Sequence, residues 1–214
     1  MKLLTVYSPS HRVLFDGFFL PSVQRYGIGM ELEALVCDQH GLGDYYTAGW
    51  NRAMQDKISA IVLAMTGMDG RTILYSDVDV QWFGEIVPGI EAALTGHDLA
   101  AMRDGDAVCA GFLAIRVSPT TRDLFCAVWA ALQRSAGYVG DQQILNRLLA
   151  ASPVRVATLP RPAFWNLGKH WTRGEPIPGI PVGVLLQHAN WVRGVEAKRT
   201  LMEHVRLSIE GARA

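Results

Sequence analysis

The chain has 214 residues, half of them hydrophobic, and is long enough to bury one substantial core. Its 20 basic and 20 acidic residues cancel, which argues against a nucleic-acid-binding surface and against attraction to an acidic membrane. Any phosphate recognition must therefore be local, and we expect a small-molecule partner.

The N-terminal part alternates predicted strands with predicted helices. Short apolar runs predict strands at 3–7, 31–37 and 72–77. Apolar residues at helical spacing predict helices at 11–23, disturbed by Pro21, and at 45–65. Such alternation predicts an α/β fold with a mainly parallel sheet flanked by helices, in which ligands bind beyond the carboxyl ends of the strands.

The C-terminal part adds a predicted antiparallel portion. Strands at 98–102 and 109–117 are joined by Asp104-Gly105-Asp106, which has turn chemistry. Residues 160–181 are rich in Pro, Gly and Trp, and we expect an ordered loop over the site without a regular element. Helices are predicted at 119–134, from Asp141 onward and at 195–210, and short strands at 154–159 and 182–187. We expect a single domain over residues 1–214.

Cysteine usage and the N-terminus bear on the compartment. Cys37, Cys109 and Cys126 show no Cys-x-x-Cys spacing, which argues against a disulfide framework or a structural zinc site. The first apolar run is too short for a signal peptide, and no apolar stretch approaches the roughly 20 residues of a membrane span. We expect a cytoplasmic protein without a membrane span.

Asp77 and Asp79 follow the apolar run Ile73-Leu74 at the end of a predicted strand. Alternate strand residues face the same side, so their Cα atoms would lie about 6.5 Å apart and both carboxylates would converge on one point. A cation that prefers oxygen ligands, such as Mg²⁺ or Mn²⁺, would turn their mutual repulsion into binding and hold a diphosphate. The alternative is a solvated strand end.

His188 ends the last predicted strand, and Gly194 and Lys198 follow it at the start of a predicted helix. The imidazole is a further candidate metal ligand, and Gly194 would allow close approach of the backbone. Lys198 or Arg193, together with the helix N-terminus, would offer positive charge to phosphate oxygens. The alternatives are a structural histidine and a solvated lysine.

Lys57 and Asp141 each have two interpretations. Lys57 lies in an otherwise apolar predicted helix, from which its side chain either reaches solvent or, as a candidate cofactor-binding residue, contacts a phosphate or nucleobase. Asp141 either is the N-cap of its helix or accepts hydrogen bonds from sugar hydroxyls.

The tryptophans are assigned by their context. We predict that Trp165 and Trp171, in the irregular loop, offer faces on which an acceptor sugar stacks; the alternative is that they fill the loop. Trp50 and Trp82 are assigned to packing.

Four segments, in this order, resemble the nucleotide-diphospho-sugar transferase family. They are 74–83 (LYSDVDVQWF), 109–116 (CAGFLAIR), 140–143 (GDQQ) and 188–191 (HANW), the last followed by Gly194 and Lys198. The resemblance runs from about Trp50 to the C-terminal helix. The chain is similar to glycosyltransferase family seventy-seven and more distantly to the glycogenin-like family eight.

The resemblance implies a GT-A fold with a Rossmann-like sheet and a metal-dependent glycosyltransferase that uses a nucleotide-sugar donor. A UDP-sugar is the favoured donor, a glycan or other small molecule the acceptor, and retention of configuration the outcome. Asp77, Asp79 and His188 would bind Mn²⁺ or Mg²⁺, and Asp77 would also lie near the ribose.

The remaining implied roles concern the phosphates and the sugar. Lys198 and Gly194 would contact the diphosphate, and Asp141 would face the donor sugar or the acceptor. Cys109 stands where relatives often carry Asn. No catalytic base is assigned, because the leaving phosphate can itself take the acceptor's proton.

Two alternatives from other classes remain open. A phosphatase of the haloacid-dehalogenase type also has a strand that ends in Asp-x-Asp. That motif normally follows the first core strand, however, and continues to Thr or Val where this chain has Gln81. The second alternative is a non-catalytic nucleotide- or sugar-binding module that has kept the fold.

Overall fold

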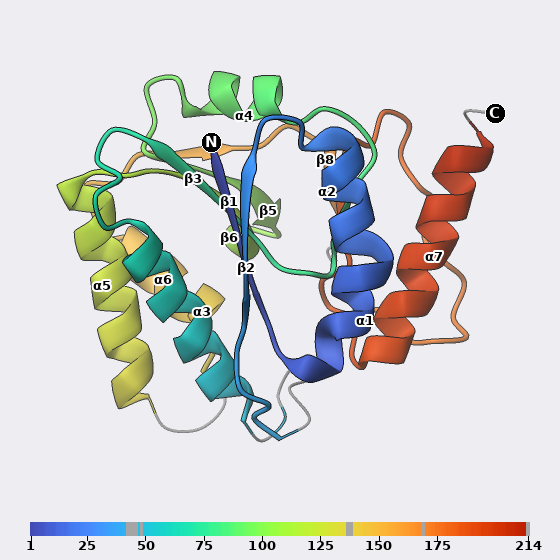
Figure 1. Ribbon diagram of the computed structural model, residues 1–214, viewed down its shortest axis with the longest axis horizontal. Coiled ribbons are helices and arrows are strands. Elements are labelled where there is room, and N and C mark those ends of the chain that lie inside the picture. Colours follow the sequence, from blue (N-terminus) through green and yellow to red (C-terminus); the bar gives the residue numbers. More distant parts are fainter. Residues whose placement is uncertain (42–46, 48, 136–138, 168–169, 213–214) are drawn as a thin grey trace.

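The computed structural model describes residues 1–41, 47, 49–135, 139–167 and 170–212. In this part of the chain, a six-stranded sheet has the order β2-β1-β3-β6-β5-β7 (Figure 1). The pairs β1/β2, β1/β3 and β5/β7 are parallel, whereas β6 is antiparallel to β3 and β5. The predicted α/β fold, with a mainly parallel sheet and an antiparallel portion, is confirmed. The strands are β1 (Lys2–Tyr7), β2 (Glu31–Val36), β3 (Thr72–Ser76), β5 (Leu99–Asp104), β6 (Ala107–Arg116) and β7 (Val156–Thr158).

Helices cover both faces of this sheet (Figure 1). One face carries α3, α5 and α6 around the buried side chains of Ile58, Phe125 and Ile144. The other face carries α1, α2, α4 and α7 around Phe19 and Leu201. The helices are α1 (Arg12–Leu14), α2 (Leu20–Tyr26), α3 (Trp50–Ala64), α4 (Val87–Leu94), α5 (Pro119–Arg134), α6 (Asp141–Leu149) and α7 (Val195–Gly211).

Two helices differ from the sequence prediction. The helix predicted at 11–23 is interrupted by the π-helical turn Phe15–Phe19, just before Pro21 in the first turn of α2. The helix predicted from Tyr45 begins at Trp50, because Gly49 is its N-cap and has a φ of 90°, outside the helical range. Tyr45 itself lies outside the described residues.

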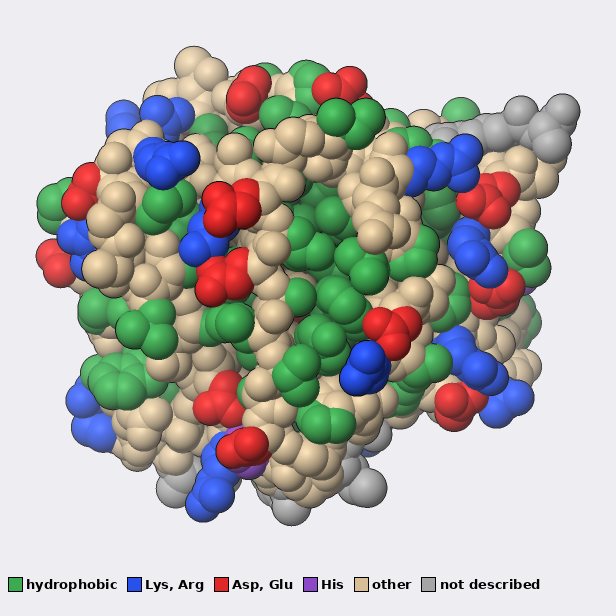
Figure 2. Space-filling model, in the orientation of Figure 1, with side chains coloured by type: hydrophobic (Ala, Val, Ile, Leu, Met, Phe, Trp, Pro, Cys, Tyr) green, Lys and Arg blue, Asp and Glu red, His purple; other side chains and the backbone are tan. Residues whose placement is uncertain are grey.

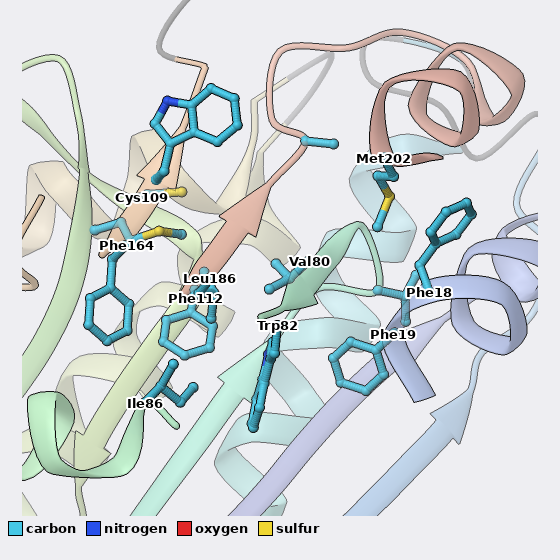
Figure 3. Close-up of a cluster of buried hydrophobic side chains, with 14 of the residues drawn as sticks. Phe18, Phe19, Val80, Trp82, Ile86, Cys109, Phe112, Phe164, Leu186 and Met202 are labelled. Carbon is cyan, nitrogen blue, oxygen red and sulfur yellow. The ribbon is translucent and has the colours of Figure 1, made fainter. Parts of the chain in front are cut away.

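A second sheet packs beside the first and has the order β4-β9-β8. Its strands are β4 (Val80–Trp82), β8 (Phe164–Asn166) and β9 (Leu186–His188). Figure 3 shows Trp82, Phe112, Phe164 and Leu186 packed together between the two sheets. The burial of these apolar side chains explains why three-residue strands persist here.

The second sheet corrects two sequence predictions. The prediction that residues 160–181 lack a regular element is wrong, because β8 lies within them and pairs in parallel with β9. The strand predicted at 182–187, with His188 at its end, does end at His188 but begins only at Leu186, and Val182 is 93% exposed. Strand pairing with β4 and β8 decided these bounds, and it is not visible in a local pattern.

β2 is an edge strand of the main sheet. Figure 2 shows hydrophobic side chains gathered along the middle of the face on which this strand lies. Leu35 and Val36 are 37% and 61% exposed.

The candidate polar side chains lie away from this strand, in a cavity beyond the carboxyl ends of β1 and β3.

Candidate functional site

The cavity beyond the carboxyl ends of β1 and β3 has a volume of about 440 Å³. This volume falls in the range typical of small-molecule sites. The cavity extends from Tyr7 on β1, past Asp77, to Asp104 at the end of β5. Six candidate residues from the sequence line it together: Lys57, Asp77, Asp79, Asp141, His188 and Lys198.

The two strand-end carboxylates are placed by backbone hydrogen bonds. The Asp77 N–H donates to the Gly111 carbonyl at 2.8 Å, which continues the β3–β6 ladder by one residue. Two residues on, the Asp79 carbonyl accepts from the Ala189 N–H at 2.9 Å. Asp77 therefore belongs to the main sheet and Asp79 to the start of the second sheet.

β9 brings His188 to the acidic pair. Val80 and His188 are paired in the antiparallel β4/β9 register, so that the histidine lies one residue beyond Asp79 across the ladder. Nε2 of His188 lies 3.3 Å from Oδ1 of Asp79, and Nζ of Lys198 on α7 lies 2.7 Å from Oδ2 of the same carboxylate. Residues far apart in the chain thus share one buried acid.

The charges of this group are coupled. Burial disfavours the ionised form of Asp79, but Lys198 and His188 beside it outweigh burial and hold the pKa of Asp79 well below its usual range. Burial likewise favours the neutral ring of His188, whereas Asp79 and Cys109 next to it raise the pKa of the ring well above its usual value. Without a cation, Asp79 is ionised between two positively charged partners.

Gly111 gives the imidazole its space. A Cβ atom at this position would overlap Cε1 of His188 and would lie 2.8 Å from Oδ2 of Asp77. Since real Cβ atoms do not make contacts this short, a side chain here would separate the histidine from the acidic pair. The glycine of the segment 109–111 is thus required by close packing.

Asp77, Asp79 and His188 form a donor set that fits a divalent cation. Their ligand atoms lie within 4.8 Å of one another. Two carboxylates and one imidazole suit Mn²⁺ and Mg²⁺ better than soft, thiolate-binding ions. Gly111 leaves the space that this convergence needs.

A second buried group surrounds Lys57. Its Nζ lies 3.1 Å from Oδ1 of Asp77 and 2.8 Å from Oδ2 of Asp141, and it lies over the Tyr75 ring at 4.7 Å from the centroid. The Tyr75 hydroxyl donates to Asp77 at 2.6 Å. Burial favours the neutral amine, yet Asp141 and Asp77 raise the pKa of Lys57, so it is a buried ammonium group.

This group excludes one of the two interpretations of each of Lys57 and Asp141. Lys57 is 3% exposed, so the expectation that it reaches solvent is wrong: it is enclosed with Asp141, while Asp77 is partly exposed toward the cavity. The interpretation of Asp141 as N-cap is also wrong, because Gly140 occupies that position and Asp141 is the first residue of α6. Gly140 packs under Trp50, where a Cβ would lie 2.5 Å from the indole, and the Asp141 side chain turns to Lys57 instead.

Asp104 organises the far side of the cavity. The predicted turn at this residue is present, but its carboxylate also accepts from Trp191 Nε1 at 2.7 Å and from Gln142 Nε2 at 2.8 Å. Trp191 has a φ of 61°, which is unusual for a bulky residue and typical of functional sites. Its ring packs edge-on against His170 at 4.8 Å between centroids. No short-range pattern signals this network.

The tryptophans of the predicted loop lie elsewhere. Trp165 and Trp171 are 7% and 4% exposed, pack in the hydrophobic core and are not among the described residues that line the cavity. Their predicted stacking on a sugar is therefore wrong: β8 and a bridge between Trp171 and Val192 turn them inward. Trp82 is buried as predicted, whereas Trp50 is buried and also lines the cavity.

Gly194 is the N-cap of α7 and has a φ of 84°, a conformation that favours glycine. Its carbonyl accepts from the Lys198 N–H at 3.1 Å, which starts the helix and aims the Lys198 side chain at Asp79. Gly194 is not among the described cavity-lining residues. Its predicted contact with a diphosphate stays a prediction.

The family model for nucleotide-diphospho-sugar transferases matches residues 40–202, and this range includes every candidate residue of the site. The chain belongs to the nucleotide-diphospho-sugar transferase family. The family predicted from the four sequence segments is confirmed. The phosphatase alternative is thereby set aside, in agreement with the position of Asp77 after β3, the third strand in the described part of the chain. The comparison with curated proteins found no match.

Several solved glycosyltransferase structures share this fold. One is involved in glycosylation of the major capsid of PBCV-1, with a TM-score of 0.61, 11% identity, and coverage of 95% of this chain and 100% of that chain. Mouse xyloside xylosyltransferase 1 gives a TM-score of 0.56 and 13% identity, with coverage of 89% and 98%. These likenesses establish the fold.

A third similar structure is the glycosyltransferase GlyE of Streptococcus pneumoniae TIGR4, with a TM-score of 0.50 and 16% identity. The match covers 72% of this chain and 44% of GlyE, so this chain spans less than half the length of that relative. Among the described residues, no helix combines the length and apolar character needed to cross a membrane.

Proposed function

We propose that this protein is a glycosyltransferase that moves a sugar from a nucleotide diphosphate donor to a hydroxyl group of an acceptor, with a divalent cation. The observation that carries the proposal is the convergence of Asp77, Asp79 and His188 in a cavity that also holds the ammonium groups of Lys57 and Lys198. Family membership supports it. A UDP-sugar is the favoured donor, and Mn²⁺ or Mg²⁺ the favoured cation.

In this proposal, charged side chains of the protein bind the cation and the phosphates of the donor. Asp77, Asp79 and His188 hold the cation, which when bound neutralises the negative charge that builds up on the departing diphosphate. Lys198 exchanges its contact with Asp79 for phosphate oxygens, because the cation then satisfies that carboxylate. The N-terminal end of α7, from which Lys198 reaches Asp79, is proposed to favour negative charge on the same side.

Asp141 is proposed to orient a sugar. Within the described residues, its Oδ2 accepts no hydrogen bond of good geometry, although Lys57 Nζ lies 2.8 Å away in an ion pair. A buried carboxylate oxygen with spare accepting capacity, at the wall of the cavity, suits a sugar hydroxyl. Lys57 pairs with Asp141 and fixes it in place, and so acts on the substrate through Asp141 rather than by direct contact.

The acceptor is proposed to bind on the side of Asp104 and Trp191, which replaces the loop tryptophans in this role. Trp191 lines the cavity, is partly exposed, and is held by its hydrogen bond to Asp104. An indole fixed in this way offers an apolar surface to a sugar ring. We propose retention of configuration, with the leaving phosphate rather than a protein base taking the acceptor's proton.

The test is nucleotide binding with and without the cation. Isothermal titration of UDP and GDP is performed in Mn²⁺ and in EDTA, and release of UDP from UDP-sugars is measured in the same buffers. We expect Mn²⁺ to raise nucleotide affinity, and Asp79→Asn to remove this effect. Asp69→Asn is the matched control, because that carboxylate is 61% exposed and pairs with Arg122 on the surface.

Equal nucleotide affinity in Mn²⁺ and EDTA would contradict a cation-bridged diphosphate. Cation-dependent nucleotide binding without donor hydrolysis or transfer, across a broad acceptor panel, would instead indicate the non-catalytic binding module. Thermal-shift screening of nucleotide sugars identifies the base and sugar, since a ligand that binds the folded state raises the melting temperature.

A further inference from the structure

Cys109 lies against the back of the candidate metal-binding histidine. Its Sγ is 3.5 Å from Nδ1 of His188, and both side chains are buried, with exposures of 1% and 5%. Figure 3 shows Cys109 at the margin of the hydrophobic cluster, near Phe164. The sulfur thus contacts the ring from the side of the hydrophobic cluster.

The two ring nitrogens of His188 face different partners. Nε2 faces the acids, at 3.3 Å from Asp79 Oδ1, and a Cβ atom added at Gly111 would lie 2.8 Å from it. Nδ1 faces Cys109. Cys109 and Gly111, two positions apart on β6, therefore both determine where the imidazole lies. Cys109 contacts Nδ1, and Gly111 leaves space for Cε1 and Nε2.

A histidine binds a cation through the lone pair of one nitrogen, and the other nitrogen then carries the proton. The group that accepts a hydrogen bond from that proton fixes the tautomer and the orientation of the ring. In this protein the nitrogen directed at the acids is Nε2, so the proton must remain on Nδ1. The sulfur of Cys109 is in position to accept it, although thiol sulfur is a weak acceptor.

We propose that Cys109 is a positioning residue for the cation: its Sγ accepts a hydrogen bond from Nδ1 of His188 and keeps Nε2 directed at Asp77 and Asp79. The inference rests on the proposed function. Cys109 is not itself a ligand, because it contacts Nδ1, whereas the carboxylates lie on the side of Nε2. No covalent or redox change of the thiol is involved.

The experiment compares Cys109→Ala and Cys109→Ser with the parent. Mn²⁺ affinity in the presence of UDP is measured by electron paramagnetic resonance of free Mn²⁺. We expect Cys109→Ala to lower the affinity about tenfold or more, as loss of an outer partner of a metal-binding histidine does. Cys109→Ser, whose hydroxyl oxygen also accepts, should recover part of that loss. Cys126→Ala, an exposed cysteine on α5, is the control and should leave the affinity unchanged.

A second readout separates positioning from general stability. Nitrogen NMR of labelled histidine in the Mg²⁺–UDP complex should show Nδ1 protonated and Nε2 without a proton in the parent, and this pattern should be lost or mixed in Cys109→Ala. Urea unfolding shows whether Cys109→Ala is merely unstable. If it is, the same measurements are made on Cys109→Ser.

Four outcomes overturn or support the inference. Unchanged Mn²⁺ affinity and an unchanged tautomer in folded Cys109→Ala overturn it, while the parent's cation-dependent UDP binding leaves the proposed function intact. A sulfur-to-metal charge-transfer band in the Co²⁺-loaded parent that disappears in Cys109→Ala makes Cys109 a ligand and also overturns it. A parent that binds no Mn²⁺ overturns both proposals. Lower affinity with a lost tautomer, recovered in part by Ser, supports it.

Discussion

Lys57 and Asp141 form a buried ion pair, with Nζ 2.8 Å from Oδ2 and side-chain exposures of 4% and 6%. Asp77 shares the same ammonium group at 3.1 Å. The pair joins α3 to the first turn of α6 and connects both to the end of β3. One cation therefore fixes the spacing of two carboxylates that would otherwise repel each other inside the cavity.

Replacing Lys57 by Met, a side chain of similar volume, should destabilise the protein by about 3–5 kcal/mol, because the buried carboxylate of Asp141 would lose its cation and Asp77 would lose the same partner. Urea unfolding followed by circular dichroism measures this loss. The loss should be smaller when Asp141→Asn is also present, since one of the stranded charges is then absent.

Lys2→Met is the matched control for this prediction. Lys2 pairs with Glu33 at 2.6 Å, but the side chains are 21% and 38% exposed, so about 1 kcal/mol or less is expected. If both lysine variants lost the same small amount of unfolding free energy, the buried ion pair would not be a determinant of stability.

Gly111→Ala should displace His188 and weaken the effect of Mn²⁺ on nucleotide affinity, because the new Cβ would overlap the imidazole. Isothermal titration in Mn²⁺ and EDTA measures the change. Gly179→Ala serves for comparison, since nothing lies within 4 Å of a Cβ there. Wild-type behaviour of Gly111→Ala would show that the ring can shift without loss of the cation site.

Trp165→Ala and Trp191→Ala should separate packing from function. Trp165 is buried in the core, and its truncation should cost about 3–5 kcal/mol of unfolding free energy. Trp191 is partly exposed at the cavity, so its truncation should reduce transfer to an acceptor more than it reduces stability or donor binding. Unfolding curves and acceptor kinetics, taken on the same samples, decide between these roles. If Trp165→Ala mainly reduced transfer and Trp191→Ala mainly reduced stability, the acceptor would bind elsewhere.

Cys37 should resist alkylation at neutral pH although it lines the cavity. Burial, and then the negative charge of Asp56, raise the pKa of its thiol to about 11, so the reactive thiolate is scarce below that pH. Its rate of reaction with iodoacetamide, followed by mass spectrometry of peptides, should rise about tenfold per pH unit between pH 7 and 10. Exposed Cys126 should react first at pH 7. Faster modification of Cys37 than of Cys126 at pH 7 would contradict a raised pKa of the Cys37 thiol.

Local patterns predicted much of the site. The spacing of Asp77 and Asp79 after an apolar run indicated convergent carboxylates, and the structure brings their oxygen atoms together with a His188 nitrogen. The expected alternation along one strand is wrong, however, because β3 ends at Ser76 and a turn at Val78 and Asp79 leads into β4. The position of Tyr75, two residues before Asp77, was an unused signal, because alternate strand residues share a face. The single domain over residues 1–214, the cytoplasmic location and the roles assigned to the site residues stay predictions.

Other features depended on contacts between distant segments. The partner of Lys57 lies on another helix, and no helical pattern tells whether a lysine reaches solvent or a buried acid. Trp165, Trp171 and Trp191 look alike in the sequence, yet β8 and a bridge to Val192 turn the first two inward while a hydrogen bond to Asp104 holds the third at the cavity.

The sequence by itself determined the alternation of strands and helices and the acidic strand end, because these depend on residue type and on spacing within one element. It also determined the family, through four short segments in a fixed order along the chain. Only the tertiary structure decided which charges meet. The β4/β9 register brings His188 to Asp79, α7 brings Lys198, and β6 brings Cys109 and Gly111 to the same imidazole. The physical reason is that strand register and side-chain packing are set by the whole core, whose contacts join residues that no local pattern connects.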